Sequence, residues 1–315
     1  MSQTSVSRAA MPISEATRLN MLSPPAGRLR CVLDTDTYNE IDDQFALVQM
    51  LLSPDRFDLQ AIYAAPFHNS RCDSPGEGME LSYQEIMRLL ERLDISPAGL
   101  VHRGVTRYVG LEKRAQPSAA VDDLIARARA SSSDDPLYVV AIAAISNVAS
   151  ALLQAPDIAD KMVVVWLGGH ALDWPDQQEF NLRQDVGGVQ VVYDCGVPMV
   201  LVPCMGSVSH LHSTIPEIES HVEPHGEIGR FLATRFKEYS TGDAVGWSKE
   251  IWDMAPVGWL LNADWTTSAL VPTPIMTRDV TYSVDRSRHL MRYVTFVRRD
   301  PIFQDFFAKL AARAG

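Results

Sequence analysis

The chain has 315 residues, of which 46% are hydrophobic and 21% are charged, and its formal net charge is −11. This composition is typical of a globular protein with material for a sizeable core. The acidic balance argues against a nucleic-acid partner, which requires clustered Lys and Arg. The lack of ~18 consecutive apolar residues argues against a membrane partner.

The ends and the cysteines indicate where the protein works. The first 27 residues contain no apolar run of signal-peptide length, so we expect a cytoplasmic protein. Residues 1–25, up to Pro24-Pro25, are predicted to form a loosely held tail, and 26–315 a single domain. No C-x-x-C spacing occurs, and a reducing compartment without disulfides is expected for the four cysteines, Cys31, Cys72, Cys195 and Cys204.

Taken in chain order, short apolar runs alternate with stretches of helical periodicity. The helical spacing of apolar residues, as at Ile41, Phe45, Val48 and Leu52, predicts helices over 41–52, 82–93, 147–154, 186–195, 227–238 and 251–261. The apolar, β-branched runs predict strands over 28–36, 59–65, 137–143, 161–167 and 198–202. A Tyr/Val/Thr pattern near 276–284 and 290–297 predicts a small antiparallel hairpin after a mainly helical C-terminal region.

Continuously apolar strands separated by helices indicate an α/β fold, with one open, mostly parallel sheet covered by helices on both faces. Ligands of such sheets bind beyond the carboxyl ends of the strands. The residues that follow each predicted strand are therefore the place to look for chemistry.

The joint between the first strand and the first helix is crowded with carboxylates. The segment DTDTYNEIDD, residues 34–43, places four aspartates within ten residues. Like charges at this density repel one another unless something positive compensates them. A hard cation with oxygen ligands is the usual compensation, and the helix N-terminus at Asp42 and Asp43 adds to it.

Two other chemistries begin with D-x-D. An EF-hand loop would require other residues at Tyr38, Asn39 and Phe45, so that interpretation fails. A phosphatase of the haloacid-dehalogenase type also places D-x-D after its first strand. It leaves the pair Asp42-Asp43 unexplained and stays an alternative.

The same segment resembles the amino-terminal motif of the nucleoside hydrolase family, which is D-x-D, a short turn, then D-D-A-x-A. Here the motif is DTDTYNEIDDQFAL, with two extra residues between Asp36 and Asp42. Further segments resemble the family in the same order, from about residue 29 to residue 270. They are Ala144-Ile-Ser-Asn147-Val-Ala149, Trp166-Leu-Gly168-Gly169, Gln178-Glu-Phe-Asn181, Cys195-Gly-Val-Pro198 and Trp252-Asp-Met-Ala255.

The resemblance implies a Ca²⁺-dependent hydrolase of the N-glycosidic bond of ribonucleosides, releasing free base and ribose. It assigns the carboxylates of Asp36, Asp43 and Asp253 to the metal, with a backbone carbonyl near Ser146. Asp36 is the implied general base, because it could hold the ion and face the attacking water together. Asp42, Asn69, Glu179 and Asn181 are the implied contacts to ribose.

The leaving base is where the sequence departs from the family. Many members have a histidine directly before the late aspartate, where this chain has Trp252, which can stack on a base but is no ordinary general acid. Either another acid protonates the base, with His102 first and His170 and His68 next, or the base leaves without much help.

Two further functions stay open at this stage, a nucleoside- or sugar-binding protein without turnover and the haloacid-dehalogenase-like phosphatase. Proteins that resemble this one commonly form oligomers. We therefore expect a homodimer or a homotetramer.

Overall fold

The computed structural model describes residues 13–240, 242 and 245–314. Its centre is an eight-stranded sheet in the order β3-β2-β1-β4-β5-β6-β12-β9, in which only β9 runs antiparallel to its neighbour. The strands are β1 (Leu29–Thr35), β2 (Phe57–Ala64), β3 (Val101–Arg103), β4 (Leu137–Ala141), β5 (Met162–Leu167), β6 (Met199–Val202), β9 (Thr266–Pro272) and β12 (Leu290–Val297). The predicted open, mostly parallel sheet is confirmed.

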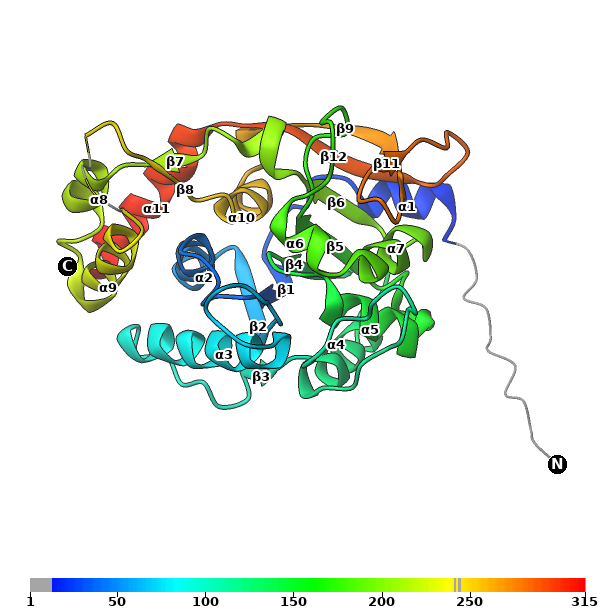
Figure 1. The fold of residues 1–315 in the computed structure, drawn as a ribbon, viewed down its shortest axis with the longest axis horizontal. Helices are drawn as coiled ribbons and strands as arrows, with labels where there is room; N and C mark the ends of the chain where they lie inside the picture. Colours follow the sequence, from blue (N-terminus) through cyan, green and yellow to red (C-terminus); the bar gives the residue numbers. More distant parts are fainter. Residues whose placement is uncertain (1–12, 241, 243–244, 315) are drawn as a thin grey trace.

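Helices cover both faces of this sheet, as predicted (Figure 1). On one side of the sheet a single core includes α2 (Asp42–Leu51), α3 (Pro75–Arg92), α10 (Met254–Leu261) and α11 (Arg299–Ala314). Farther from the sheet, α9 (Gly226–Lys237) packs against α3, and α8 (Ile215–His221) packs against α9. The other face of the sheet packs against α4 (Ala119–Arg129), α5 (Ser146–Gln154) and α7 (Val186–Asp194). The central strands β4 and β5 are buried along their whole length, which explains why they read as continuous apolar runs.

Short elements complete the chain. They are α1 (Glu15–Met21), α6 (Phe180–Gln184), the pairs β7 (His212–Ser213) with β8 (Lys249–Glu250) and β10 (Ile275–Met276) with β11 (Tyr282–Ser283), the 3₁₀ turns Pro156–Ile158 and Ala263–Trp265, and a kinked segment at Cys204–Val208. Within the described ranges, every helix is too short or too polar to cross a membrane.

Three predictions of local structure need correction. Residues 13–25 are not a loose tail, because α1 buries Met21 and is followed by the buried Leu22, while residues 1–12 lie outside the described residues. Helix α3 begins seven residues before the predicted start, because Ser74 caps it and Pro75 fits its first turn.

The third correction concerns which residues form the predicted small antiparallel hairpin, which is present but does not join 276–284 to 290–297. The segment 275–276 pairs instead with 282–283, and β12 lies inside the main sheet between β6 and β9. The reason is burial, since Met291 and Tyr293 pack into one core and Val294 and Val297 into the other. A strand that is apolar on both faces is stable only as an internal strand.

Candidate active site

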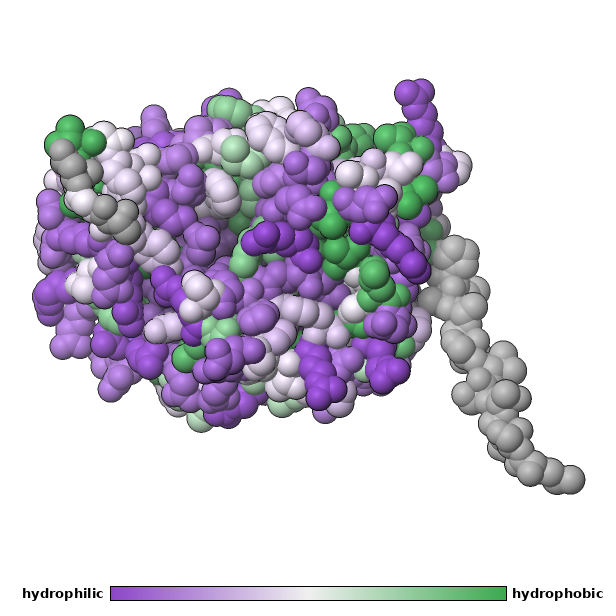
Figure 2. Space-filling view, viewed as in Figure 1, coloured by the Kyte–Doolittle hydropathy of each residue, from purple (hydrophilic) through white to green (hydrophobic). Residues whose placement is uncertain are grey.

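A cavity opens at the carboxyl edge of the sheet, beyond β1, β4 and β5, where the N-terminal ends of α2, α6 and α10 meet. Hydrophilic side chains dominate this face of the molecule in Figure 2, including its centre, where Figure 1 shows these strands. Twelve residues line the cavity: Asp36, Asn39, Glu40, Asp42, Asp43, Ile142, Leu167, Glu179, Phe180, Asn181, Trp252 and Asp253. The position agrees with the rule for ligands of parallel sheets.

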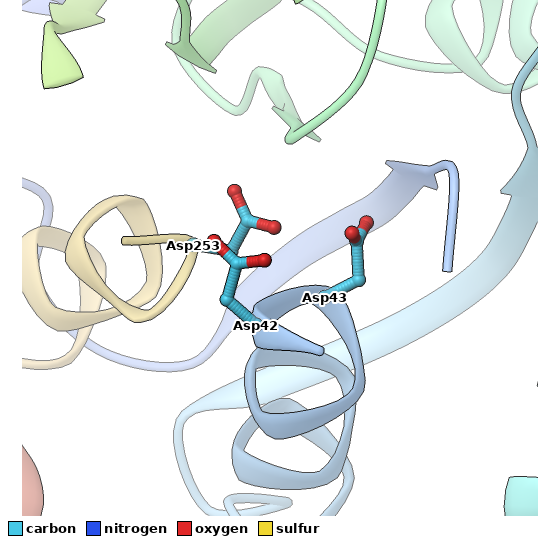
Figure 3. A group of neighbouring side chains, drawn as sticks. All are labelled: Asp42, Asp43 and Asp253. Atoms are coloured by element: carbon cyan, nitrogen blue, oxygen red, sulfur yellow. The ribbon is translucent and has the colours of Figure 1, made fainter. Parts of the chain in front are cut away.

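Three carboxylates from distant parts of the chain converge here. Carboxylate oxygens of Asp42, Asp43 and Asp253 all lie within 4.8 Å of one another, and each side chain is buried. Asp42 and Asp43 begin α2, Asp253 directly precedes α10, and all three point into the same space (Figure 3). The two helix N-termini partly offset the negative charge.

Asp36 adds a fourth carboxylate directly after β1. It is 1% exposed, and neither of its oxygens has a hydrogen-bond partner among the described residues. Burial, and then the charge of Asp43, raise the pKa of Asp36 well above its ordinary value. Burial and the charge of Asp42 do the same for the pKa of Asp253, whose Oδ1 also lacks a partner. A buried carboxylate in this state requires a proton or a cation.

The other two carboxylates that were predicted here are better satisfied. Burial raises the pKa of Asp42 to about 7, although Lys249 and backbone N–H groups act in the opposite direction. Burial raises the pKa of Glu179 to about 6. Its carboxylate accepts hydrogen bonds of 2.8 Å from the backbone N–H groups of Gly169, Asn181 and Leu182, which fix it at the start of α6.

The structure thus brings together seven of the residues predicted from sequence. Asp36, Asp42, Asp43, Glu179, Asn181, Trp252 and Asp253 all line the one cavity. Asp42, which was assigned to ribose, also belongs to the converging carboxylate group. The cavity unites residues separated by more than two hundred positions of sequence.

His102 lies elsewhere, which corrects its predicted role. It sits on the edge strand β3, with its Nε2 3.7 Å from a carboxylate oxygen of Asp123 and its ring edge-on to Tyr63. His170, the second candidate acid, stacks edge-on against Trp174 on the loop after β5. Neither these two nor His68 belongs to the lining. None of the histidines of the described chain belongs to the lining of this cavity.

Asn69 and Ser146 are also absent from the lining. The side chain of Asn69 donates to Oδ1 of Asn39 at 2.8 Å, so its effect on the cavity passes through Asn39. The hydroxyl of Ser146 donates to Asp185 at 2.6 Å. Ile142, directly after β4, is the residue of that segment that reaches the cavity.

Sequence reasoning missed five lining residues: Asn39, Glu40, Ile142, Leu167 and Phe180. The available signal for Asn39 and Glu40 was the longer turn between Asp36 and Asp42. Ile142 and Leu167 end strands at the carboxyl edge, but apolar residues in that position carry no chemical signal of their own.

Comparisons with known proteins agree with this geometry. The pattern of the family described as inosine-uridine preferring nucleoside hydrolase matches residues 31–301. A pyrimidine-specific ribonucleoside hydrolase, RihA of Salmonella typhimurium, is 26% identical over 264 residues, which are 75% of this chain and 80% of the relative. The non-specific ribonucleoside hydrolase RihC of Salmonella agona is 24% identical over 257 residues, 75% of this chain and 79% of the relative.

A solved structure shows the same fold. The purine-preferring ribonucleoside hydrolase from Gardnerella vaginalis superposes with a TM-score of 0.73 at 18% identity, covering 90% of this chain and 99% of its own.

Proposed function

We infer the function from the premise that this chain belongs to the inosine-uridine preferring nucleoside hydrolase family. It is a hydrolase that cleaves the N-glycosidic bond of nucleosides. We propose more specifically that it acts on ribonucleosides, releases free base and ribose, and depends on Ca²⁺. The family match also removes the haloacid-dehalogenase-like alternative, and the relatives' names favour an enzyme over a binding protein without turnover.

One observation carries the proposal of a cation. Asp36 is buried, neither of its oxygens has a partner in the part of the chain that the structure describes, and it lies beside the converging group of Asp42, Asp43 and Asp253. Oxygen-rich, anionic sites of this kind fit Ca²⁺, which takes 6–8 oxygen ligands. The donor set therefore fits the ion, and Asp36, Asp43 and Asp253 would hold it.

The backbone carbonyl in the proposed ligand set is better drawn from Ile142 than from Ser146, because Ile142 lines the cavity. The bound ion would lower the pKa of a water molecule and fix the sugar hydroxyls.

The roles of the side chains follow from their charge and position. Asp36, whose carboxylate oxygens have no hydrogen-bond partner among the described residues, would accept the proton of the attacking water. Asp42, Glu179 and Asn181 would bind the ribose hydroxyls and favour the positive charge that develops on the sugar. Because Trp252 lines the cavity and none of the described histidines does, Trp252 would assist the leaving base by stacking on it.

A base-release assay tests the proposal. Purified protein would be incubated with a panel of purine and pyrimidine ribonucleosides, in Ca²⁺ and after chelation with EGTA. We expect release of base and ribose in Ca²⁺, loss of at least nine tenths of the rate with EGTA, and recovery on adding Ca²⁺ back. Turnover that is indifferent to chelation would contradict the metal assignment, and no base release from any nucleoside would contradict the activity.

We also propose that the enzyme works in the cytoplasm as a homodimer or homotetramer on a small nucleoside. A monomeric mass by light scattering at micromolar concentration would contradict the oligomeric state.

A further inference from the structure

The turn that joins β1 to α2 supplies a residue to the cavity that the family motif does not contain. It has two residues more than the short turn of that motif, and Asn39 lies within it. The side chain of Asn39 is 7% exposed and lines the cavity. Its backbone N–H donates to the carbonyl of Asp36 at 2.7 Å, so its position is tied to that of the proposed general base.

The turn between β1 and α2 is held in place by hydrogen bonds to side chains of α2 and α3. The side chain of Gln44 on α2 donates to the carbonyl of Thr37 at 3.3 Å and to the buried carboxylate of Glu85 on α3 at 2.8 Å. The backbone N–H of Tyr38 donates to the hydroxyl of Ser82 at 3.4 Å. Gln44 stands where the family motif has alanine, so the longer turn and its support occur together in this chain.

A chain of hydrogen bonds fixes which way the amide of Asn39 faces. The backbone N–H of Arg71 can only donate, and it donates to Oδ1 of Asn69 at 2.9 Å. The Nδ2 of Asn69 therefore points the other way and donates to Oδ1 of Asn39 at 2.8 Å. With its oxygen occupied, Asn39 has its Nδ2 left over, and that nitrogen has no hydrogen-bond partner among the described residues.

Side-chain donors are few in this cavity, and besides Asn39 the indole N–H of Trp252 is a lining donor without a partner among the described residues. Six of its twelve lining residues are carboxylates, which only accept hydrogen bonds when ionised: Asp36, Glu40, Asp42, Asp43, Glu179 and Asp253. The Nδ2 of Asn181 already donates to the carbonyl of Leu167 at 3.2 Å. The hydroxyl hydrogens of a nucleoside suit the carboxylates, but the acceptor lone pairs on its base and on its hydroxyl oxygens need a hydrogen-bond donor, which an ionised carboxylate cannot supply.

We propose that Asn39 is a substrate-binding residue whose Nδ2 donates to an uncharged acceptor atom of the bound nucleoside, and that Asn69 is a positioning residue that holds it in the donor orientation. The proposal rests on the proposed function for the class of ligand. The acceptor is either the base atom beside the glycosidic bond, N3 of a purine or O2 of a pyrimidine, or the 5′-oxygen of the ribose.

Variants at the two positions test the orientation. Asn39→Ala removes the donor, and we expect kcat/KM to fall about tenfold, the range for one lost hydrogen bond to a substrate. Asn69→Asp leaves residue 39 unchanged, but its carboxylate can only accept, so Asn39 must turn its Nδ2 toward it and present its oxygen to the substrate. We expect a similar tenfold loss. Ser70→Asp, which adds the same charge at the exposed neighbouring residue, should stay within twofold of wild type.

Substrate analogues identify the acceptor. The factor between wild type and Asn39→Ala would be measured with adenosine, 3-deazaadenosine and 5′-deoxyadenosine. If N3 accepts the bond, the factor falls to near one with the 3-deaza compound, and if the 5′-oxygen does, it falls to near one with the 5′-deoxy compound. A factor that persists with both, or an Asn39→Ala protein within twofold of wild type on adenosine, overturns the proposal.

Two controls are needed. One shows that a loss of activity does not come from misfolding or lost metal binding, and the other tests the donor role even if the protein has no hydrolase activity. The Ca²⁺ affinity of Asn39→Ala, measured by calorimetry without substrate, should match that of wild type, because this substitution adds no charge to the cavity. Its thermal midpoint shows whether the variant is folded. If the wild type releases no base, the same ratios are taken from nucleoside dissociation constants. In that case, a nucleoside affinity about tenfold weaker in Asn39→Ala than in wild type would support the donor role of Asn39. Equal affinities would contradict it.

Discussion

Two buried aspartates differ sharply in the hydrogen bonds that their carboxylates accept. Asp185, at the start of α7, and Asp36, after β1, are each 1% exposed. Asp185 accepts four hydrogen bonds of 2.6–3.0 Å, from the hydroxyl of Ser146 and from three backbone N–H groups, those of Val109, Gly110 and Gly188. Asp36 accepts none through its side chain from the described residues.

The number of accepted hydrogen bonds distinguishes a carboxylate that stabilises the fold from one that is available to bind a ligand. The protein satisfies Asp185 internally, so this side chain joins the loop before α4 to helices α5 and α7 and stabilises the fold. It leaves Asp36 uncompensated among like charges, which costs stability and preserves lone pairs for a ligand. Burial alone would have ranked the two residues as equals.

The sharpest way to break this comparison is Asp36→Asn. We expect the rate of base release to fall by about a thousandfold or more, because the proposed general base and a metal ligand are both lost. The metal-free variant should also melt at a higher temperature than metal-free wild type, because one unpaired buried charge is gone. Activity above a tenth of wild type, or a lower melting point, would contradict the assignment.

The corresponding substitution at the other aspartate, Asp185→Ala, should lower stability and leave activity nearly unchanged. The substitution leaves buried N–H groups without partners, so we expect the free energy of unfolding, measured in urea, to fall by about 3 kcal/mol. The kcat of the folded enzyme should stay within about fivefold of wild type, as expected for a residue outside the cavity. A large loss of kcat in fully folded protein would mean that Asp185 acts in catalysis.

The pH dependence of stability sharpens the comparison further. Burial raises the folded-state pKa of Asp34 and of Asp42 from 3.8 to about 7, and that of Glu179 from 4.5 to about 6. Between about pH 4 and pH 7 the folded chain therefore binds more protons than the unfolded chain, and stability falls as pH rises. Metal-free protein should melt several degrees higher at pH 5 than at pH 8.

Burial also raises the pKa values of the proposed metal ligands Asp36, Asp43 and Asp253 well above their ordinary value. Saturating Ca²⁺ should reverse the order of melting temperatures, because the cation competes with protons for the oxygens of these three carboxylates. Melting curves in metal-depleted buffers with and without Ca²⁺ would show it. A metal-free melting point that rises steadily from pH 5 to pH 8 would contradict the burial of uncompensated carboxylates.

The smallest expected effect is that of His102→Ala. The imidazole lies near Asp123 and Tyr63, outside the cavity. We expect kcat/KM to change by less than about twofold, because no catalytic contact is lost. A hundredfold loss in the base-release assay would restore His102 as the acid and require a rearrangement of β3.

The sequence predicted the sheet and most of the cavity for a physical reason. Strands buried on both faces are continuous apolar runs, and the residues that follow them, such as Asp36, must meet at one edge. The pairing of β12 could not be predicted in this way, because local pattern does not reveal that residues 290–297 enter the sheet beside β6.

Side-chain partners were equally hidden from sequence. His102 and Asn69 stood at plausible strand ends, yet Asp123 and Asn39 lie beside them for reasons that only packing in three dimensions decides. Asn39 itself was visible only as part of an insertion of unknown purpose.

The span between Asp43 and Asp253 also bears on how the protein is made. Since α10 follows α2 by some two hundred residues, a ribosome must release nearly the whole polypeptide before these carboxylates can meet. Until Asp253 has left the ribosome, the acidic turn at 34–43 lacks the carboxylate that completes the converging group with Asp42 and Asp43. Nascent chains that end before Asp253 would therefore have no nucleoside hydrolase activity.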